Sequence, residues 1–321
     1  MIPILQAKSV TKSSDEQRTL LSSISLVVRE NERLAIVGET GSGKSTLLKS
    51  LGGLAEIDRG EVLFRGEKVE GPEEKLVAGH AHISYLSQHF ELPKFITVRD
   101  FLSRKEIIRV EDPEQIYRAC SVQHLLDRET RALSGGEKQR VALTKELLKA
   151  PEVLLLDEPF SNLDFNHKRI IRDVLEEIEN DLHVTVILVA HDPKDVLSWA
   201  DRVMVLRKGE VVQLDRPDSI FERPVDEYVA SLFGPYSILS AGPKIKGMLA
   251  DHHTIDKQVF LRPHDIAIGA NSKGMQGKVL KVRYYGGYDQ LLIQSEFGTL
   301  LANAIVGQYA EGQEITFSLN K

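Results

Sequence analysis

Hydrophobic positions in the first two thirds of the chain alternate between strand-like and helix-like spacing. Two short runs, residues 153–156 and 184–189, are almost entirely apolar, which is typical of strands buried on both faces. Residues 136–149 and 166–179 carry apolar side chains at helical spacing. Strands that alternate with helices predict a largely parallel sheet with helices on its faces, so this part of the chain is assigned to the α/β class.

The pattern changes near residue 234. Gly and Pro accumulate at residues 234–247, which predicts a linker. Beyond it the helical spacing ends, and five or six short strands in about 65 residues predict a small β-barrel. We therefore expect two domains, at residues 1–235 and 236–321, with a mainly helical subdomain at about 90–150 within the first.

Composition narrows the classes of function. The 321 residues are too many for one ordinary domain, and the formal net charge is −6, from 41 basic and 47 acidic residues. Since no basic run stands out, nucleic acid is not an expected partner. No apolar run approaches the roughly 20 residues that a membrane-spanning helix needs. The single cysteine, Cys120, cannot form an internal disulfide, which favours a reducing compartment.

The stretch GETGSGKST has the spacing of a phosphate-binding loop, with a predicted strand before it and a predicted helix after it. Its glycines allow backbone N–H groups to curl around phosphate oxygens, Lys44 is placed to reach the β- and γ-phosphates, and Ser45 to bind Mg²⁺. A glycine-rich turn that only caps a helix is the structural alternative, and the flanking strand and helix favour the nucleotide site. The candidate nucleotide-binding residues are Gly38, Glu39, Thr40, Gly41, Ser42, Gly43, Lys44, Ser45 and Thr46.

Two carboxylates end the apolar strand in VLLLDEP. Asp157 comes at the C-terminal end of the strand, where α/β sheets hold their ligands, and a buried acid there suits Mg²⁺. Glu158 is placed to polarise a water molecule for attack on a γ-phosphate. Acids after a strand most often only cap a helix, but a phosphate loop in the same chain favours the catalytic interpretation.

Five motifs in one order now stand together. After GETGSGKST come the glutamine of ISYLSQ, then LSGGEKQR, then VLLLDEP followed by SNLD, and finally VILVAHD. In this order and spacing they resemble the nucleotide-binding subunit of an ABC transporter over roughly residues 1–235. The resemblance implies a P-loop ABC ATPase domain with a helical subdomain, and an ATPase that uses ATP and Mg²⁺.

The resemblance also implies roles for residues outside the phosphate loop. Gln88 is expected to contact Mg²⁺ and the attacking water, and His191 to contact the γ-phosphate. Each has a structural alternative, since Gln88 could be an ordinary polar strand end and His191 a structural histidine. Asp164 is expected to communicate across a dimer, and a helix N-cap is its alternative.

The Ser-Gly-Gly turn that opens LSGGEKQR is a second anion site in the same chain. Ser134, Gly135 and Gly136 begin a predicted helix, and a helix N-terminus with free N–H groups favours phosphate. In the family that this chain resembles, the turn closes over ATP held by the phosphate loop of a second subunit. One copy of each motif therefore implies a head-to-tail dimer, with a homodimer of this chain as the simplest form.

The C-terminal segment VFLRPHDIAIG is similar to the opening of the small OB-like barrel domain called TOBE, found on ATPases of bacterial solute importers. This resemblance implies membrane permease partners, an external solute-binding protein acting through the permease, and a peripheral position at the cytoplasmic face of the inner membrane. Ferric iron, polyamine or an oxyanion is the expected cargo, with sugar as a further option. Two alternatives stay open: a soluble ABC ATPase acting on DNA or ribosomes, and the ATPase of an exporter.

One departure from the family pattern concerns the base of the nucleotide. An aromatic residue near the end of the first strand usually stacks on adenine, but residues 10–24 contain none. The flat guanidinium of Arg18 is the available substitute. We therefore predict weaker discrimination between ATP and GTP than in relatives that carry the aromatic residue.

Overall fold

The chain forms two compact units, Met1–Pro217 and Asp218–Lys321. The two units are described separately below. The expected domain boundary at 235/236 stays a prediction, although α7 (Glu227–Leu232) and most of α6 (Pro217–Glu222) fall in the second unit. The computed structural model describes residues 3–88, 91–104, 108–161, 163–240, 253–255, 258–269 and 274–319.

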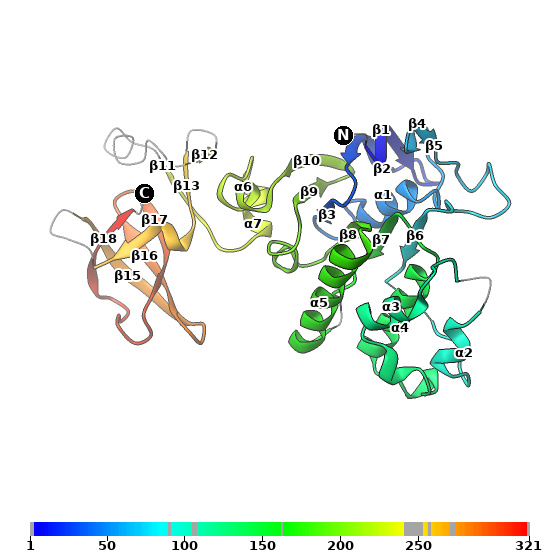
Figure 1. Cartoon of the computed structure of the whole chain (residues 1–321). Coiled ribbons are helices and arrows are strands. Elements are labelled where there is room, and N and C mark those ends of the chain that lie inside the picture. The colour runs from blue at the N-terminus through cyan, green and yellow to red at the C-terminus, as the bar shows by residue number, and fades with distance from the viewer. Residues whose placement is uncertain are drawn as a thin grey trace. The chain divides into compact units, whose positions relative to one another are not determined.

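A six-stranded sheet forms the centre of the first unit (Figure 1). Its strand order is β10-β9-β3-β8-β7-β6, and every neighbouring pair is parallel except β10 with β9. The strands are β3 (Arg33–Val37), β6 (Ile83–Leu86), β7 (Val153–Asp157), β8 (Thr185–Val189), β9 (Arg202–Arg207) and β10 (Glu210–Asp215). Every residue of β7 and β8 is buried, which explains their nearly continuous apolar sequence and confirms the predicted parallel sheet.

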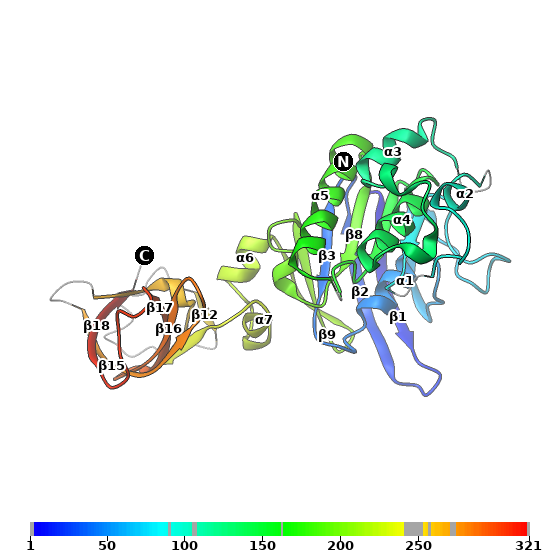
Figure 2. The same ribbon diagram turned by 90° about the horizontal axis from the view of Figure 1, so that it is seen from below.

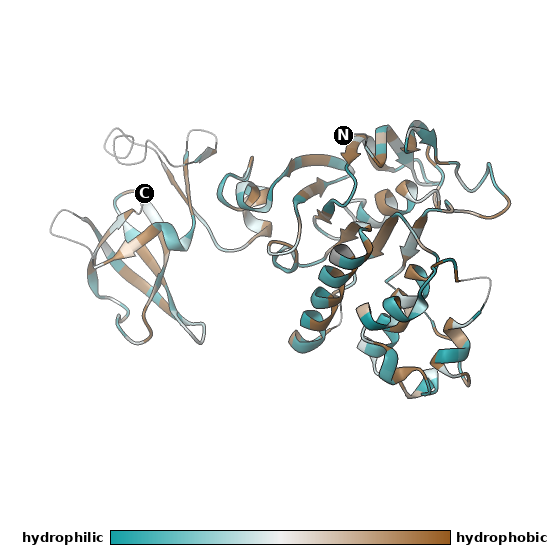
Figure 3. Cartoon of the chain, viewed as in Figure 1, coloured by the Kyte–Doolittle hydropathy of each residue, from teal (hydrophilic) through white to brown (hydrophobic). Residues whose placement is uncertain are grey.

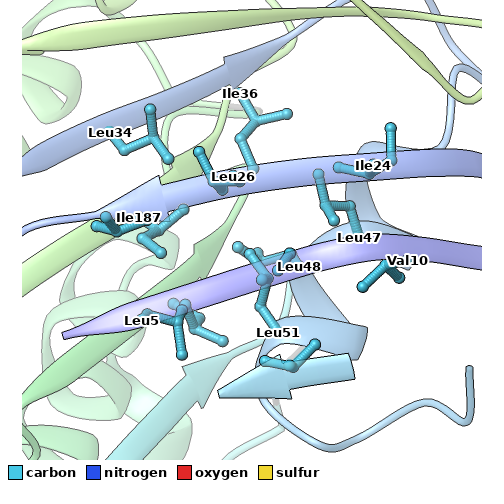
Figure 4. Packing of buried hydrophobic residues seen from close by; sticks show 14 of the residues in the cluster. Leu5, Val10, Ile24, Leu26, Leu34, Ile36, Leu47, Leu48, Leu51 and Ile187 are labelled. Atoms are coloured by element: carbon cyan, nitrogen blue, oxygen red, sulfur yellow. The ribbon is translucent and has the colours of Figure 1, made fainter. Parts of the chain in front are cut away.

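A smaller antiparallel sheet, in the order β2-β1-β4-β5, covers helix α1 (Lys44–Leu51). Its strands are β1 (Leu5–Ser13), β2 (Thr19–Val28), β4 (Arg59–Phe64) and β5 (Glu67–Lys68). Figure 4 shows Leu47, Leu48 and Leu51 of the helix packed among side chains from both sheets. Because side chains from both sheets pack against α1, the start of the helix and the phosphate loop before it are held in a fixed position.

The remaining helices of the first unit are α2 (Val98–Leu102), α3 (Pro113–Ala119), α4 (Gly135–Leu147) and α5 (Phe165–Leu182). The first three lie together in the predicted helical subdomain (Figure 1). Helix α5 alternates apolar and polar residues along its length, as Figure 3 shows, and this stripe is the helical spacing seen in the sequence. In the part of the chain that the structure describes, no helix is long and apolar enough to cross a membrane.

The second unit contains the small β-barrel that the sequence predicts (Figure 2). A five-stranded antiparallel sheet has the order β14-β18-β15-β16-β17, and a three-stranded sheet has the order β11-β13-β12. Inward-facing residues such as Leu291 and Ile293 alternate with outward ones. The strands are β11 (Ser237–Ser240), β12 (Thr254–Ile255), β13 (Gln258–Leu261), β14 (Ile266–Ile268), β15 (Met275–Tyr284), β16 (Asp289–Ser295), β17 (Gly298–Ala304) and β18 (Glu314–Leu319).

The linker expected at residues 234–247 was wrong in one part. Ser237–Ser240 form β11, which pairs antiparallel with β13 and places Leu239 fully inside the barrel core. The burial of Leu239 and the hydrogen bonds from β13 outweigh the surrounding glycines and prolines. Residues 241–247 of that expected linker lie outside the described residues.

Candidate functional site

The phosphate loop lies between β3 and α1, as predicted. Gly38, Gly41 and Gly43 have φ angles of 149°, 80° and 101°. A Cβ at Gly38 would lie 2.2 Å from the carbonyl oxygen of Leu206, whereas a Cβ at Gly41 would meet nothing within 4 Å. Gly38 therefore serves close packing, and Gly41 leaves the exposed rim of the loop open to a ligand.

Two polar side chains inside the loop fit a phosphate group. Lys44 is buried, and its Nζ donates hydrogen bonds of 2.8 and 2.9 Å to the carbonyl oxygens of Gly38 and Glu39. Burial lowers the pKa of Lys44, and the nearby carboxylates oppose that shift. Ser42 Oγ is buried without a hydrogen-bond partner among the described residues. A bound phosphate would supply acceptors for both groups.

Ser45 and Asp157 meet as the sequence predicts. Ser45 Oγ donates a 2.8 Å hydrogen bond to Asp157 Oδ1, and Tyr85 donates a 2.9 Å hydrogen bond to Oδ2 of the same carboxylate. Burial, followed by the charge of Asp157, raises the pKa of Tyr85, so the phenol stays a donor. A serine hydroxyl and a carboxylate are oxygen ligands of the kind that Mg²⁺ prefers, and the donor set therefore fits that ion.

Glu158 and Gln88 also lie together. Gln88 Nε2 donates a 2.9 Å hydrogen bond to Glu158 Oε2 and lies 3.4 Å from Ser161 Oγ. Glu158 has a φ of 53°, a left-handed conformation that is uncommon for residues other than glycine. Its backbone N–H donates to Val189 O at 3.0 Å, and Ser161 Oγ donates to its carbonyl at 2.9 Å. These bonds hold the strained residue in position at the strand end.

His191 is exposed at the end of β8 and lines a hollow of about 400 Å³ together with Gln88 and Glu158. The loop after His191 is fastened to helix α5 by Asp195. This buried carboxylate lies 2.5 Å from Lys168 Nζ and 2.8 Å from a guanidinium nitrogen of Arg172. The structure therefore brings His191 to the same hollow as the predicted base.

The Ser-Gly-Gly turn opens α4 through a capping box. Ser134 Oγ accepts from the backbone N–H of Glu137 at 3.3 Å, and the Glu137 carboxylate accepts from the backbone N–H of Ser134 at 2.7 Å. Gly135 is exposed and lines a second hollow of about 170 Å³ with Asp157 and Glu158. Among the described residues that line this hollow, none belongs to the phosphate loop at residues 38–46.

Asp164 precedes α5 and has an exposed side chain. Its Oδ1 accepts 2.9 Å hydrogen bonds from the backbone N–H and from the ring Nδ1 of His167. The backbone bond from His167 is the main cause of a lowered pKa for Asp164. Asp164 therefore caps the N-terminus of α5, as the structural alternative proposed. The expected role of Asp164 across a dimer stays a prediction.

Several residues of the site were not singled out from the sequence. Tyr85 donates to the Asp157 carboxylate and Ser161 to the backbone carbonyl of Glu158, while Gln139 donates a 2.6 Å hydrogen bond to the carbonyl of Pro159, next to Glu158. All three residues lie within the motifs themselves: Tyr85 in ISYLSQ, Gln139 in LSGGEKQR, and Ser161 as the first residue of SNLD. Their contacts, however, depend on tertiary packing, which no local pattern displays.

The β1–β2 hairpin, which contains the segment expected to face the base, lies against the phosphate loop. The carbonyl oxygen of Leu20 lies 2.6 Å from where a Cβ of Gly43 would be, so the hairpin touches the phosphate loop. Arg18 is exposed just before β2. Arg18 lies two residues before Leu20, at which the hairpin approaches the phosphate loop. Its role in stacking on the nucleotide base stays a prediction.

Comparisons with known proteins identify a matching family model and similar proteins. Residues 21–161 match the family model described as ABC transporter. The chain is 31% identical over 309 residues to the sulfate/thiosulfate import ATP-binding protein of Synechococcus elongatus, with 92% of this chain and 87% of that protein covered. It is 30% identical over 315 residues to the spermidine/putrescine import ATP-binding protein of Haemophilus influenzae, with 88% and 83% covered.

Solved structures share the fold of the first unit. One is cbiO1 from Clostridium perfringens, part of the ABC transporter complex cbiONQ, with a TM-score of 0.60, 25% identity, and 68% of this chain and 91% of that chain covered. Another is an ATP-binding cassette of an ABC transporter in its ADP conformation. It has a TM-score of 0.63 and 22% identity, and the match covers 73% of this chain and 99% of that chain. Because its import relatives match over most of their length, the chain belongs to the ABC transporter family of ATP-binding proteins and is an ABC-type ATPase.

Proposed function

We propose that the chain hydrolyses ATP in a head-to-tail homodimer and thereby drives solute import through membrane permease partners. The observation that carries the proposal is the hydrogen bond from Ser45, at the phosphate loop, to Asp157 at the end of β7, with Glu158 as the next residue. It supports a site in which a phosphate cradle, an oxygen-ligand set and a general base would act together.

The phosphate loop would hold the β- and γ-phosphates of ATP. Lys44 would exchange its two carbonyl acceptors for phosphate oxygens, and Ser42 Oγ would gain the partner that it lacks. Ser45 and Asp157 would hold Mg²⁺, with Gln88 as a further oxygen ligand. The ion, when bound, supplies positive charge that neutralises charge developing on the phosphate oxygens.

Glu158 would accept the proton of the attacking water. Gln88 holds one oxygen of this carboxylate at 2.9 Å, which leaves the other oxygen to orient the water. His191, on the same hollow, would contact the γ-phosphate and thereby link hydrolysis to the loop that Asp195 fastens to α5. Positioning and electrostatics are the main contributions that a protein makes to phosphoryl transfer.

A second copy of the chain would complete each site. Ser134, Gly135 and Gly136 present the N-terminus of α4, and the exposed Gly135 has no atom within 4 Å of where its Cβ would be. That open position allows a γ-phosphate held by the partner's loop to approach the helix N-terminus closely. Asp164, beside this turn, would respond to the closed state across the dimer.

The import role and the partners come from the relatives. Two proteins that the chain resembles are named import ATP-binding proteins, one for sulfate/thiosulfate and one for spermidine/putrescine. We infer a cargo in the polyamine, oxyanion or ferric iron group, and a peripheral position at the cytoplasmic face of the inner membrane. The barrel of residues 236–321 would be a TOBE domain, and residues 1–235 the ATPase domain.

One surface of the first unit suits a permease. The large apolar side chains Leu76 and Val77 are exposed, at 107% and 79% of full accessibility. Val77 also lines a hollow of about 430 Å³ with Leu54 and Tyr85. Since Tyr85 holds Asp157, a permease segment seated in this hollow would contact the ligand set of the ATP site through one side chain.

A pull-down from native membranes tests the proposal. The bait is the Glu158→Gln protein with Mg-ATP, because it should bind ATP and hydrolyse it slowly, and the matched control is the Glu158→Gln, Lys44→Ala protein. Mass spectrometry should find a multi-span permease with the bait and less of it with the control. Recovery of ribosomal or DNA-repair proteins without a permease would overturn the import role while leaving the ATPase assignment intact.

A further inference from the structure

One histidine lies between Asp164 and the Ser-Gly-Gly turn, the two features that the proposed function assigns to the dimer contact. His167, in the first turn of α5, contacts Asp164 with its Nδ1 and approaches Gly136 with the edge of its ring. The side chain of His167 is 36% exposed, so the ring is only partly open to solvent.

The contact with Asp164 fixes the orientation of the ring. The Asp164 carboxylate can only accept, so the Nδ1 that lies 2.9 Å from it carries the proton. The same Oδ1 also accepts from the backbone N–H of His167 at 2.9 Å. The backbone bond fixes the carboxylate at the start of α5, and the Nδ1 bond holds the ring against that carboxylate.

The contact with Gly136 distinguishes the two glycines of the turn. A Cβ at Gly136 would lie 2.5 Å from His167 Cδ2, closer than real Cβ contacts. A Cβ at Gly135 would meet nothing within 4 Å. Gly135 is thus the glycine that is open to a ligand, whereas Gly136 is the glycine that admits the histidine ring.

We propose that His167 is a positioning residue that locks the Ser-Gly-Gly turn to Asp164, so that both move as one body against the ATP of the second subunit. The inference rests on the proposed head-to-tail site. His167 acts through Gly136 and Asp164, and it does not touch the nucleotide held by its own chain. Losing it should therefore reduce turnover while leaving ATP binding to the chain's own phosphate loop intact.

A double-mutant cycle on the full chain tests the ring contact. Gly136→Ala and His167→Ala are made singly and together, and kcat for ATP hydrolysis is measured for each. Gly136→Ala should lower kcat by roughly a hundred-fold in the wild-type background, because the clash displaces the turn. In the His167→Ala background the same change should cost only about three-fold, because the clash is absent.

Gly135→Ala is the matched control, since its Cβ lies away from the ring. Its cost in kcat should be the same whether residue 167 is histidine or alanine. Equal costs of Gly136→Ala in both backgrounds would overturn the inference. Absence of ATP hydrolysis by the wild-type chain would instead overturn the proposed function, and the inference would fall with it.

Two further variants separate the contacts of His167 and guard against misfolding. His167→Asn keeps a donor for Asp164 but removes the ring edge, and His167→Phe keeps the ring but removes the donor. Each should recover part of the roughly ten-fold loss of kcat that His167→Ala causes, with the Kd for ATP unchanged. If neither variant exceeds His167→Ala, or if Kd and kcat change together, His167 has no positioning role.

Discussion

Ser45 Oγ, at the first turn of α1, lies 2.8 Å from Asp157 Oδ1, at the end of β7. The two residues come from the two halves of the proposed nucleotide site, the phosphate loop and the acidic strand end. Their hydrogen bond holds the two segments together in the single chain. Preorganisation of this kind is what an ATPase needs, because little rearrangement then remains for the chemical step.

Tyr85→Phe should weaken the metal-binding half of the site. The tyrosine hydroxyl donates a 2.9 Å hydrogen bond to Asp157 Oδ2. Without this bond the Asp157 carboxylate is free to rotate away from the position in which it would bind Mg²⁺. The Mg²⁺ concentration for half-maximal ATP hydrolysis should rise by roughly ten-fold. Tyr117→Phe, on α3 away from the site, is the control. An unchanged Mg²⁺ requirement would show that Tyr85 only packs.

Discrimination between ATP and GTP should be weak, because residues 10–24 lack an aromatic ring. Arg18→Tyr should increase the preference for ATP by roughly ten-fold, since a stacked aromatic adds about 1–3 kcal/mol. Competition of GTP against labelled ATP measures the effect, with Arg29→Tyr as a control outside this segment. A wild-type preference for ATP equal to that of relatives with the aromatic residue would refute the prediction.

The sequence predicted those helices and strands whose apolar spacing is visible within one continuous segment. Residues 136–149 and 166–179 correspond to α4 and α5. Helix α5 buries an apolar stripe that includes Ile171, Val174 and Ile178, whereas α4 is buried on most sides and also buries polar residues such as Gln139 and Arg140. Contacts between distant segments were beyond local patterns. Tyr85 reaches Asp157 only because β6 pairs with β7 in a register that sets Tyr85 opposite Leu155. The His167 ring reaches Gly136 only through the packing of α5 beside the start of α4.

Cys120 should make stability fall at high pH. Burial raises the pKa of its thiol from 9.0 to about 12 in the folded chain. Between these values the unfolded thiol loses its proton and the folded thiol keeps it, so the free energy of unfolding decreases as pH rises from 9 to 12.

Urea unfolding of the wild type and of Cys120→Ala, at pH 8 and at pH 10.5, measures this effect. The wild type should lose more free energy of unfolding between the two pH values than the alanine variant does, because only the wild type carries the buried thiol. An identical pH dependence of the two proteins would show that Cys120 ionises as readily in the folded chain as in the unfolded one.

Arg262 should be a sensitive position of the second unit. Its guanidinium is buried, donates to the carbonyl oxygens of Phe221 and Ala230 at 3.0 and 3.1 Å, and stacks 4.3 Å from the ring of Phe221. Burial is the main cause that lowers the pKa of Arg262 to about 10. Arg262→Lys replaces a planar fork by one ammonium group and should destabilise the unit by about 3 kcal/mol.

Hydrogen exchange of the β13 amides in the full chain reports this loss, since Arg262 directly follows that strand. Arg283→Lys, at an exposed position of β15, is the matched control and should stay within about 0.5 kcal/mol of wild type. Equal protection of β13 in the two variants would remove Arg262 from this structural role.

The central claim is that Glu158 is the base of an ATP site closed by two copies of the chain. The direct measurement is ATP hydrolysis by Glu158→Gln, with Glu176→Gln on the exposed face of α5 as control, and with light scattering of each protein in Mg-ATP. Glu158→Gln should bind ATP, accumulate as a dimer and hydrolyse at least about a hundred-fold more slowly, whereas Glu176→Gln should match wild type. Wild-type hydrolysis by Glu158→Gln would contradict the account.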